Sequence, residues 1–178
     1  MAERPDFTSN PFKEETSFGA VSAVITPVEE FREEVRKAMC LPDEGVVIEI
    51  HMREAVRGNG SKGNKHAGIL GVIRESFENV ASELNRWGIE AHFVVAITNR
   101  VAGLTSQRYG FTVQEISQEH VDRQRIEWAW EGFKLTSRYD PDNDKIEDMR
   151  IFACYQSFKH FMREFGGHAD SVPEEVSS

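Results

Sequence analysis

The sequence predicts a single α/β domain built on a mixed central sheet. Strand-like and helix-like segments alternate along its 178 residues, which is the pattern of a sheet covered by helices. With 39% hydrophobic residues, a chain of this length can bury one core without disulfides or metals. We expect the domain to span residues 17–167, with little fixed structure in residues 1–16 and 168–178, which are polar and contain prolines.

The first half of the domain should contain two strands and two helices. Residues 18–25 form the first expected strand. The sequence Thr26-Pro27-Val28-Glu29 is a capping box with proline at the first helical position, and it predicts a helix that runs to Met39. Residues 46–52 alternate in polarity as a second strand does, with Glu49 and His51 on one face. A long helix is expected at residues 67–87, because apolar residues recur there at helical spacing.

The segment from Gly88 to Phe111 predicts a strand, a capped helix and a turn in immediate succession. Residues 93–97 form a short apolar run, which is typical of a central strand buried on both faces. Asn99 can cap the helix that follows. Gly110 supplies the left-handed residue that ends this helix.

The last third of the domain predicts two more strands and one helix. The strands are expected at residues 112–116 and 149–153, and the helix ends at Gly166-Gly167. Residues 125–135 remain open between strand and helix, because Ile126, Trp128 and Trp130 alternate strictly but could also close a helix begun near residue 117. Residues 140–144 predict a turn, because they lack the glycine and distal glutamate of an EF-hand loop.

Composition excludes several classes of function. A net charge of −9 argues against a general nucleic-acid binder, because phosphate binding needs a positive face. Cys40 and Cys154 have no partners at metal-ligand spacing, so we expect no metal site and a reducing compartment. The chain has no apolar run of about eighteen residues and no signal-peptide pattern. A cytoplasmic protein without membrane contact is therefore expected.

The spacing Asn99-x-x-Ala102 followed by Gly110-Phe111 resembles the end of the acyl-CoA-binding core in the GCN5-related N-acetyltransferase (GNAT) family. The resemblance covers residues 46–116, less than half of the chain. It implies a GNAT-like fold whose sheet splays open between two parallel strands, here residues 46–52 and 93–98. It also implies acetyl-CoA or another acyl-CoA as cofactor, and acyl transfer to a primary amine of a small molecule or a protein.

The family's phosphate signature, R/Q-x-x-G-x-G/A, matches two registers of this sequence. One begins at Arg57. The other begins at Lys65 and is preferred, because it keeps the family's usual distance to Asn99. Residues 53–65 also carry an excess of positive charge in an acidic protein, which favours an anion site before a helix. The cofactor-binding residues that the resemblance implies are Arg57, Lys65, His66, Gly68, Leu70, Gly71 and Asn99.

Four residues are candidates for catalysis, and one of them, Glu54, is a candidate base just beyond the strand at residues 46–52. Glu49 and His51 lie on the strand that matches the family's fourth strand, and either could accept the proton of the acceptor ammonium. Ser106 stands where many members carry the tyrosine that protonates the thiolate, and Tyr109 comes three residues later. Because that tyrosine is missing, a non-catalytic GNAT-like protein that binds a partner through Trp128 and Trp130 stays open as the alternative. A homodimer is compatible with either hypothesis.

Overall fold

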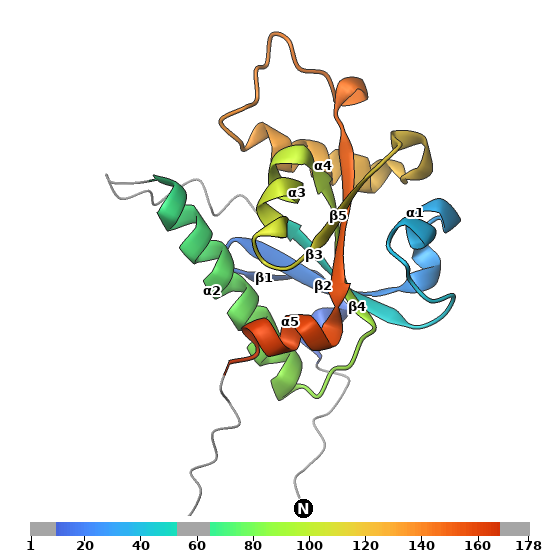
Figure 1. The fold of residues 1–178 in the computed structure, drawn as a ribbon, viewed down its shortest axis with the longest axis vertical. Coiled ribbons are helices and arrows are strands. Elements are labelled where there is room, and N and C mark those ends of the chain that lie inside the picture. Colours follow the sequence, from blue (N-terminus) through green and yellow to red (C-terminus); the bar gives the residue numbers. More distant parts are fainter. Residues whose placement is uncertain (1–9, 53–64, 168–178) are drawn as a thin grey trace, which may run out of the picture.

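The fold is a six-stranded mixed sheet with helices on both faces (Figure 1). The computed structural model describes residues 10–52 and 65–167, with the backbone alone for residues 65–70. Strand order is β1-β2-β3-β4-β6-β5. The strands are β1 (Thr16–Phe18), β2 (Val21–Pro27), β3 (Val46–Met52), β4 (Phe93–Asn99), β5 (Thr112–Ile116) and β6 (Ile151–Ser157). The helices are α1 (Glu33–Ala38), α2 (Lys65–Arg86), α3 (Arg100–Gln107), α4 (Arg123–Lys134) and α5 (Phe158–Phe165). The predicted α/β class and mixed sheet are therefore confirmed.

The sheet consists of two antiparallel halves that meet at β3 and β4. On its outer side β3 pairs with β2 along its whole length, and β4 does the same with β6. β3 and β4 are neighbours in the sheet and run parallel. Within their described lengths of seven residues, they pair only at Ile48–Val94 and Glu49–Val95. In its carboxyl-terminal half, β3 therefore pairs with β2 but not with β4. The same half of β4 pairs with β6 but not with β3.

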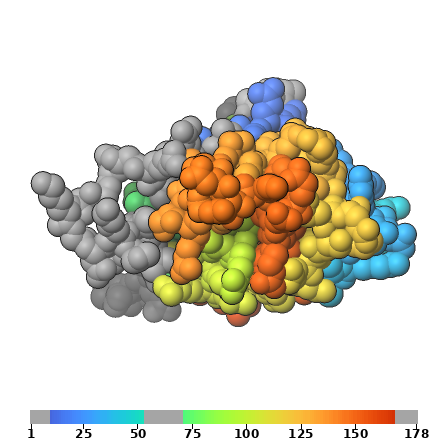
Figure 2. All heavy atoms as spheres, turned by 90° about the horizontal axis from the view of Figure 1, so that it is seen from above, coloured from blue at the N-terminus to red at the C-terminus, as the bar shows by residue number. Residues whose placement is uncertain are grey.

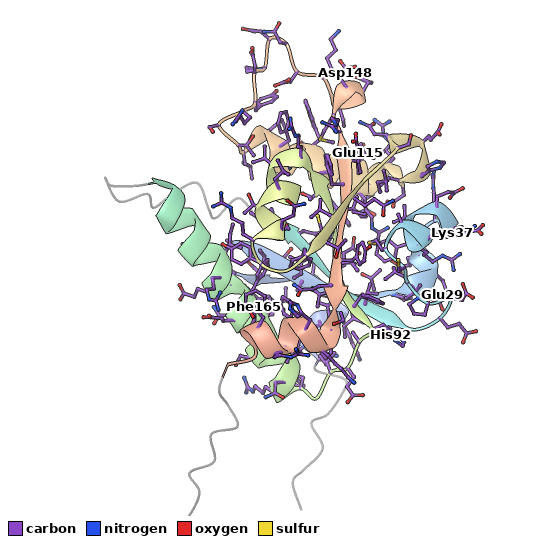
Figure 3. The ribbon with its side chains drawn as sticks, in the orientation of Figure 1. Glu29, Lys37, His92, Glu115, Asp148 and Phe165 are labelled. Carbon is purple, nitrogen blue, oxygen red and sulfur yellow. The ribbon has the colours of Figure 1, made fainter. Side chains whose placement is uncertain are left out.

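Each face of the sheet has its own core. On one face α2 and α5 lie side by side, and the ring of Phe77 on α2 packs against four other aromatic rings, at centroid distances of 5.2–5.9 Å. Phe165 of this group points from α5 toward α2, whereas Lys37 and Glu29 point outward at the other side of the molecule (Figure 3). The opposite core contains α1 and α4 with Val47, Val95 and Ile97 of the two central strands.

The amino-terminal segment is structured from Asn10 onward, so the expectation of little fixed structure in residues 1–16 is wrong for residues 10–16. Phe12 is fully buried, and its ring stacks on Phe18 at a centroid distance of 5.3 Å. A single phenylalanine among polar residues produces no periodicity, which is why the sequence did not reveal this anchor. Residues 1–9 and 168–178 lie outside the described residues.

The capping box at Thr26 does not start a helix. Thr26 and Pro27 are the last residues of β2, and α1 begins only at Glu33, after a 3-10 turn at Val28–Glu30. The Thr26 hydroxyl donates instead to Oε2 of Glu49 on the neighbouring strand, at 2.9 Å. A long-range partner therefore takes the hydroxyl that the local motif would use as a cap.

Residues 123–134 form a helix, which settles the segment that the sequence left open. Asp122 caps α4 by accepting from the Arg125 amide at 3.2 Å. The indole of Trp130 packs against Phe133 and Tyr139, so α4 also anchors the segment that follows it. Viewed from above, this segment (orange) spreads over the end of the molecule beside α3 (yellow-green) (Figure 2).

α3 has the boundaries that the sequence predicted. The backbone conformation of Gly110, just after this helix, leads to a testable prediction about stability. Gly110 has a φ of +88°, and a Cβ added there would lie 2.6 Å from Cε1 of His160. We expect Gly110→Ala to lower the free energy of unfolding by about 1–3 kcal/mol. As a control, Gly71→Ala in α2, where the new Cβ meets nothing within 4 Å, should raise it by about 0.5–1 kcal/mol. Denaturant titration of both variants checks this, and equal stabilities would contradict it.

Candidate functional site

A cavity of about 300 Å³ opens where β3 and β4 separate. Both strands line it with their last residues, and side chains alternate between the two faces of a sheet. Ile50, Met52 and Ala96 belong to the core of the α2 face, whereas Ile97 belongs to the core of the α4 face. Side chains from both faces of the sheet therefore line the cavity.

On the α2 face the cavity wall is apolar except for Thr98 and Ser106. Phe77, Phe111 and Ala102 line this part together with the strand residues. The Ser106 hydroxyl donates to the Ala102 carbonyl at 2.8 Å and also contacts the thiol of Cys154. Burial raises the pKa of Cys154 to about 12, so this thiol stays protonated. Ser106 lies at the cavity, but its proton is committed to the backbone of its own helix.

On the α4 face the wall is polar and aromatic. Trp128 and Glu131 of α4 and Leu135, the C-cap residue of this helix, follow one another at helical spacing and face the cavity. The ring of Trp128 lies 4.4 Å from the ring of His51, at an interplanar angle of 45°, and the residue remains 36% exposed. Glu15, from the segment before β1, completes this part of the wall. Trp128 therefore faces the cavity, whereas Trp130 packs within the core of the α4 face.

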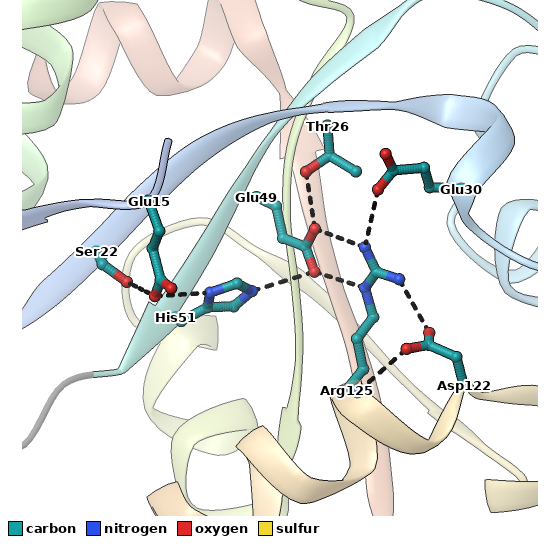
Figure 4. A network of polar contacts seen from close by, with 8 residues as sticks. All are labelled: Glu15, Ser22, Thr26, Glu30, Glu49, His51, Asp122 and Arg125. Atoms are coloured by element: carbon teal, nitrogen blue, oxygen red, sulfur yellow. Dashed lines mark hydrogen bonds and ion pairs between the residues drawn. The ribbon is translucent and has the colours of Figure 1, made fainter. Parts of the chain in front are cut away.

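Glu49 is a buried carboxylate that is ionised at neutral pH. Its residue is 1% exposed, and Arg125 donates to both carboxylate oxygens, from Nε to Oε1 at 2.7 Å and from Nη2 to Oε2 at 2.8 Å (Figure 4). Burial alone would raise the pKa of Glu49, but the hydrogen bonds and charge of Arg125, with those of His51, hold it at about 2. A carboxylate with so low a pKa is a weak base, so this geometry favours a charge-holding role for Glu49.

His51 lies between two carboxylates. Nδ1 is 3.2 Å from Oε1 of Glu15, and Nε2 makes an ion-pair contact of 3.1 Å with Oε1 of Glu49 (Figure 4). Burial alone would lower the pKa of His51, but Glu49 and Glu15 together raise it above its usual 6.5. Glu15 is held in turn by the Ser22 hydroxyl, which donates to the same oxygen. The imidazole can therefore store a proton beside the cavity.

Arg125 fixes α4 against β3. Besides Glu49, its guanidinium contacts Asp122 at 2.9 Å and lies over the Phe31 ring, 4.3 Å from the centroid. Asn99 makes a second tie, because its amide nitrogen donates to the Ala129 carbonyl at 3.2 Å. The position of the α4 wall relative to the two central strands thus depends on buried polar contacts.

The structure brings only part of the predicted site together. His51 and Ser106 line one cavity, His51 toward α4 and Ser106 toward α3, whereas Glu49 is buried behind His51 and pairs with Arg125 of α4. Asn99 is 1% exposed, and its side chain caps α3 by accepting from the Ala102 amide at 3.0 Å. Gly71 is exposed on α2. The remaining predicted cofactor residues have side chains outside the described residues: Arg57, Lys65, His66, Gly68 and Leu70.

The sequence did not point to three residues of this site. Glu15 came from a segment expected to be unstructured, and Arg125 and Glu131 come from a segment whose structure stayed open. Trp128 was noted in the sequence, but nothing there separated it from Trp130. Fixing α4 as a helix would have supplied the missing signal, because Trp128, Glu131 and Leu135 then share one face.

Comparisons of this chain with protein-family models, curated proteins and solved structures found no match. Among the described residues, no cluster of histidine, cysteine, aspartate and glutamate side chains is placed to hold a metal ion. The helices in the same part of the chain include none with the length and apolar character needed to cross a membrane.

Proposed function

We propose that this protein is an acyl-CoA-dependent N-acyltransferase of the GNAT type, which transfers an acetyl group to a primary amine. One observation carries the proposal: β3 and β4 are parallel, pair at only two of their described positions and leave a cavity that side chains from both faces of the sheet line. In the GNAT family acyl-CoA occupies a splay between two parallel strands. The residues that resemble those two strands in the sequence are the ones that separate here.

The two faces of the cavity suit two different ligands. The apolar wall near Phe77 and Phe111 suits the acyl group and the adjoining thioester arm, whereas the wall near Glu15 and Trp128 suits a cationic amine. The gap between the strands would allow the amine nitrogen to reach the thioester carbon. Holding both reactants in line removes much of the entropic part of the barrier. α2 begins at Lys65, where the preferred phosphate register starts, so its first-turn N–H groups would bind the pyrophosphate.

The described residues also suit the proton transfers of this reaction. The Glu15 carboxylate, which lines the cavity and contacts Nδ1 of His51, relays a proton from the acceptor ammonium to neutral His51. The amine nitrogen then attacks the thioester carbonyl and forms the C–N bond. Collapse of the tetrahedral intermediate breaks the C–S bond and releases the coenzyme A thiolate, which takes its proton from solvent, because Ser106 donates to Ala102. Glu49 stays ionised throughout and stabilises the imidazolium.

Turnover in the presence of amines tests this proposal. We expect free thiol to accumulate from acetyl-CoA only when a primary amine is present, and mass spectrometry should detect the N-acetylated amine in equal amount. Hydrolysis without an amine serves as the background. Thiol release that does not depend on any amine would contradict N-acyl transfer.

A non-catalytic GNAT-like binding protein is the second candidate, and the state of Ser106 favours it. No described residue of the α3 wall offers the acidic proton that many members of the family supply with a tyrosine. This alternative predicts acyl-CoA binding without turnover of any amine. It also predicts a protein partner whose binding depends on the half-exposed Trp128.

A further inference from the structure

We propose that the acceptor is a cationic amine without a carboxylate or phosphate group, and that it binds between Glu15, Trp128 and Glu131. This inference rests on the proposed function, because it names the acceptor class for the same cavity. It follows from the charge of the α4 wall and from the open face of one indole.

The charge of the α4 wall selects against acidic acceptors. Glu15 and Glu131 face the cavity, and its described lining residues include no lysine or arginine. Behind His51, carboxylates outnumber cations among the described residues of the polar network, because Arg125 is shared by Glu49, Asp122 and Glu30. A carboxylate or phosphate on the acceptor would meet like charges at short range in a partly desolvated site, where repulsion is strong.

Trp128 supplies a surface on which a cation can lie. His51 packs against its ring, yet the residue stays 36% exposed at the cavity. An ammonium or guanidinium group over an indole face is attracted by the negative face of the ring. A carboxylate or phosphate group gains nothing comparable from this surface, so the indole favours cationic groups while Glu15 and Glu131 disfavour acidic ones.

Glu131 lies within reach of a cation held on this indole. It follows Trp128 by three residues on α4, so the two side chains are neighbours on the helix surface. Glu131 pairs with Lys134 at 2.6 Å, but its side chain is 67% exposed, and exposed pairs of this kind are weak. The carboxylate therefore keeps an oxygen for a ligand. Glu127 provides a matched control, because it pairs with Arg123 and lines a different hollow of the surface.

Acceptor pairs that differ by one carboxylate test the inference. We compare agmatine with arginine, and phenethylamine with phenylalanine, at saturating acetyl-CoA. We expect kcat/KM to favour the decarboxylated member of each pair at least about 10-fold, which corresponds to about 1.4 kcal/mol. Glu131→Lys should reduce this preference severalfold, whereas Glu127→Lys should leave it unchanged. Equal kcat/KM values within the pairs would overturn the inference and leave the acyltransferase proposal intact.

Direct binding separates failure of this inference from failure of the proposed function. Calorimetric titration with agmatine and with arginine requires no turnover. Agmatine binding that weakens severalfold in Trp128→Leu, together with weaker arginine binding, would support the cationic site even if no amine were acylated. Absence of agmatine binding, or arginine binding of equal strength, would overturn it. Thermal unfolding of Trp128→Leu verifies that the variant is folded.

Discussion

Replacing Arg125 with methionine should lower the free energy of unfolding by about 3–5 kcal/mol, because it leaves the Glu49 carboxylate buried without its cation. Glu49 is 1% exposed, and Arg125 supplies two of its hydrogen bonds. Methionine has a similar length, so little packing is lost. Denaturant titration measures the effect. The matched control is Arg123→Met, two residues earlier on α4, where the side chain is 85% exposed and the expected change is below about 0.5 kcal/mol.

The pH dependence of stability distinguishes loss of the ion pair from loss of packing. The folded-state pKa of Glu49 is about 2, below the ordinary value of 4.5, so its contribution is present above pH 4.5 and is lost as pH falls toward 2. In Arg125→Met, burial without the cation should raise the pKa of Glu49, so this acid-dependent loss should disappear. Adding Glu49→Leu should recover most of the stability. If Arg125→Met lost stability between pH 4.5 and pH 2 as the wild type does, this assignment would be contradicted.

Replacing His51 with glutamine should reduce kcat about 10²- to 10⁴-fold, because the acceptor ammonium loses its base. The KM for acetyl-CoA should stay within a few-fold, because His51 faces α4 and the acyl group lies on the other face of the sheet in our proposal. Steady-state assays of thiol release measure both. His120→Gln is the control, since His120 lies half-exposed beside Glu34 and Glu119. Full activity in His51→Gln would rule out His51 as the base.

The sign of the pH response follows from the raised pKa of His51. The base must be neutral, so kcat/KM should rise as pH increases through a pKa above 6.5. In His51→Gln this rise of kcat/KM with pH should be absent. The imidazolium between Glu15 and Glu49 stabilises the fold below pH 6.5, and this contribution is lost as pH rises through the folded-state pKa. Activity and the stability due to His51 should therefore change in opposite directions over the same pH range.

The elements that the sequence predicted best are those with local signals. The strand at residues 46–52 has the bounds expected from its alternation, and Asn99 and Gly110 mark the limits of α3 as their capping chemistry predicts. These signals depend on residues close together in the chain. The capping box at Thr26 failed because Glu49, 23 residues away, takes its hydroxyl.

The site was harder to predict because its contacts are long-range. The sequence placed Glu49 and His51 on one face of a strand but could not tell that Arg125, 76 residues later, neutralises the first. Nor could it show that Glu15 reaches the second, 36 residues away. Glu49 and His51 were equivalent candidates in the sequence, and the structure distinguishes them. The Glu49 carboxylate is held by the guanidinium of Arg125, whereas the His51 imidazole faces the cavity.

Calorimetric titration with acetyl-CoA, in wild type and in Ala96→Trp, tests the central claim most directly. Ala96 lines the cavity on β4, so an indole at this position would fill the gap between the separated strands. We predict binding by the wild type and a loss of at least about 10-fold in affinity in the variant, with both proteins folded by thermal unfolding. Absence of binding by the wild type, or equal affinity in both proteins, would contradict the claim that acyl-CoA occupies the space between β3 and β4.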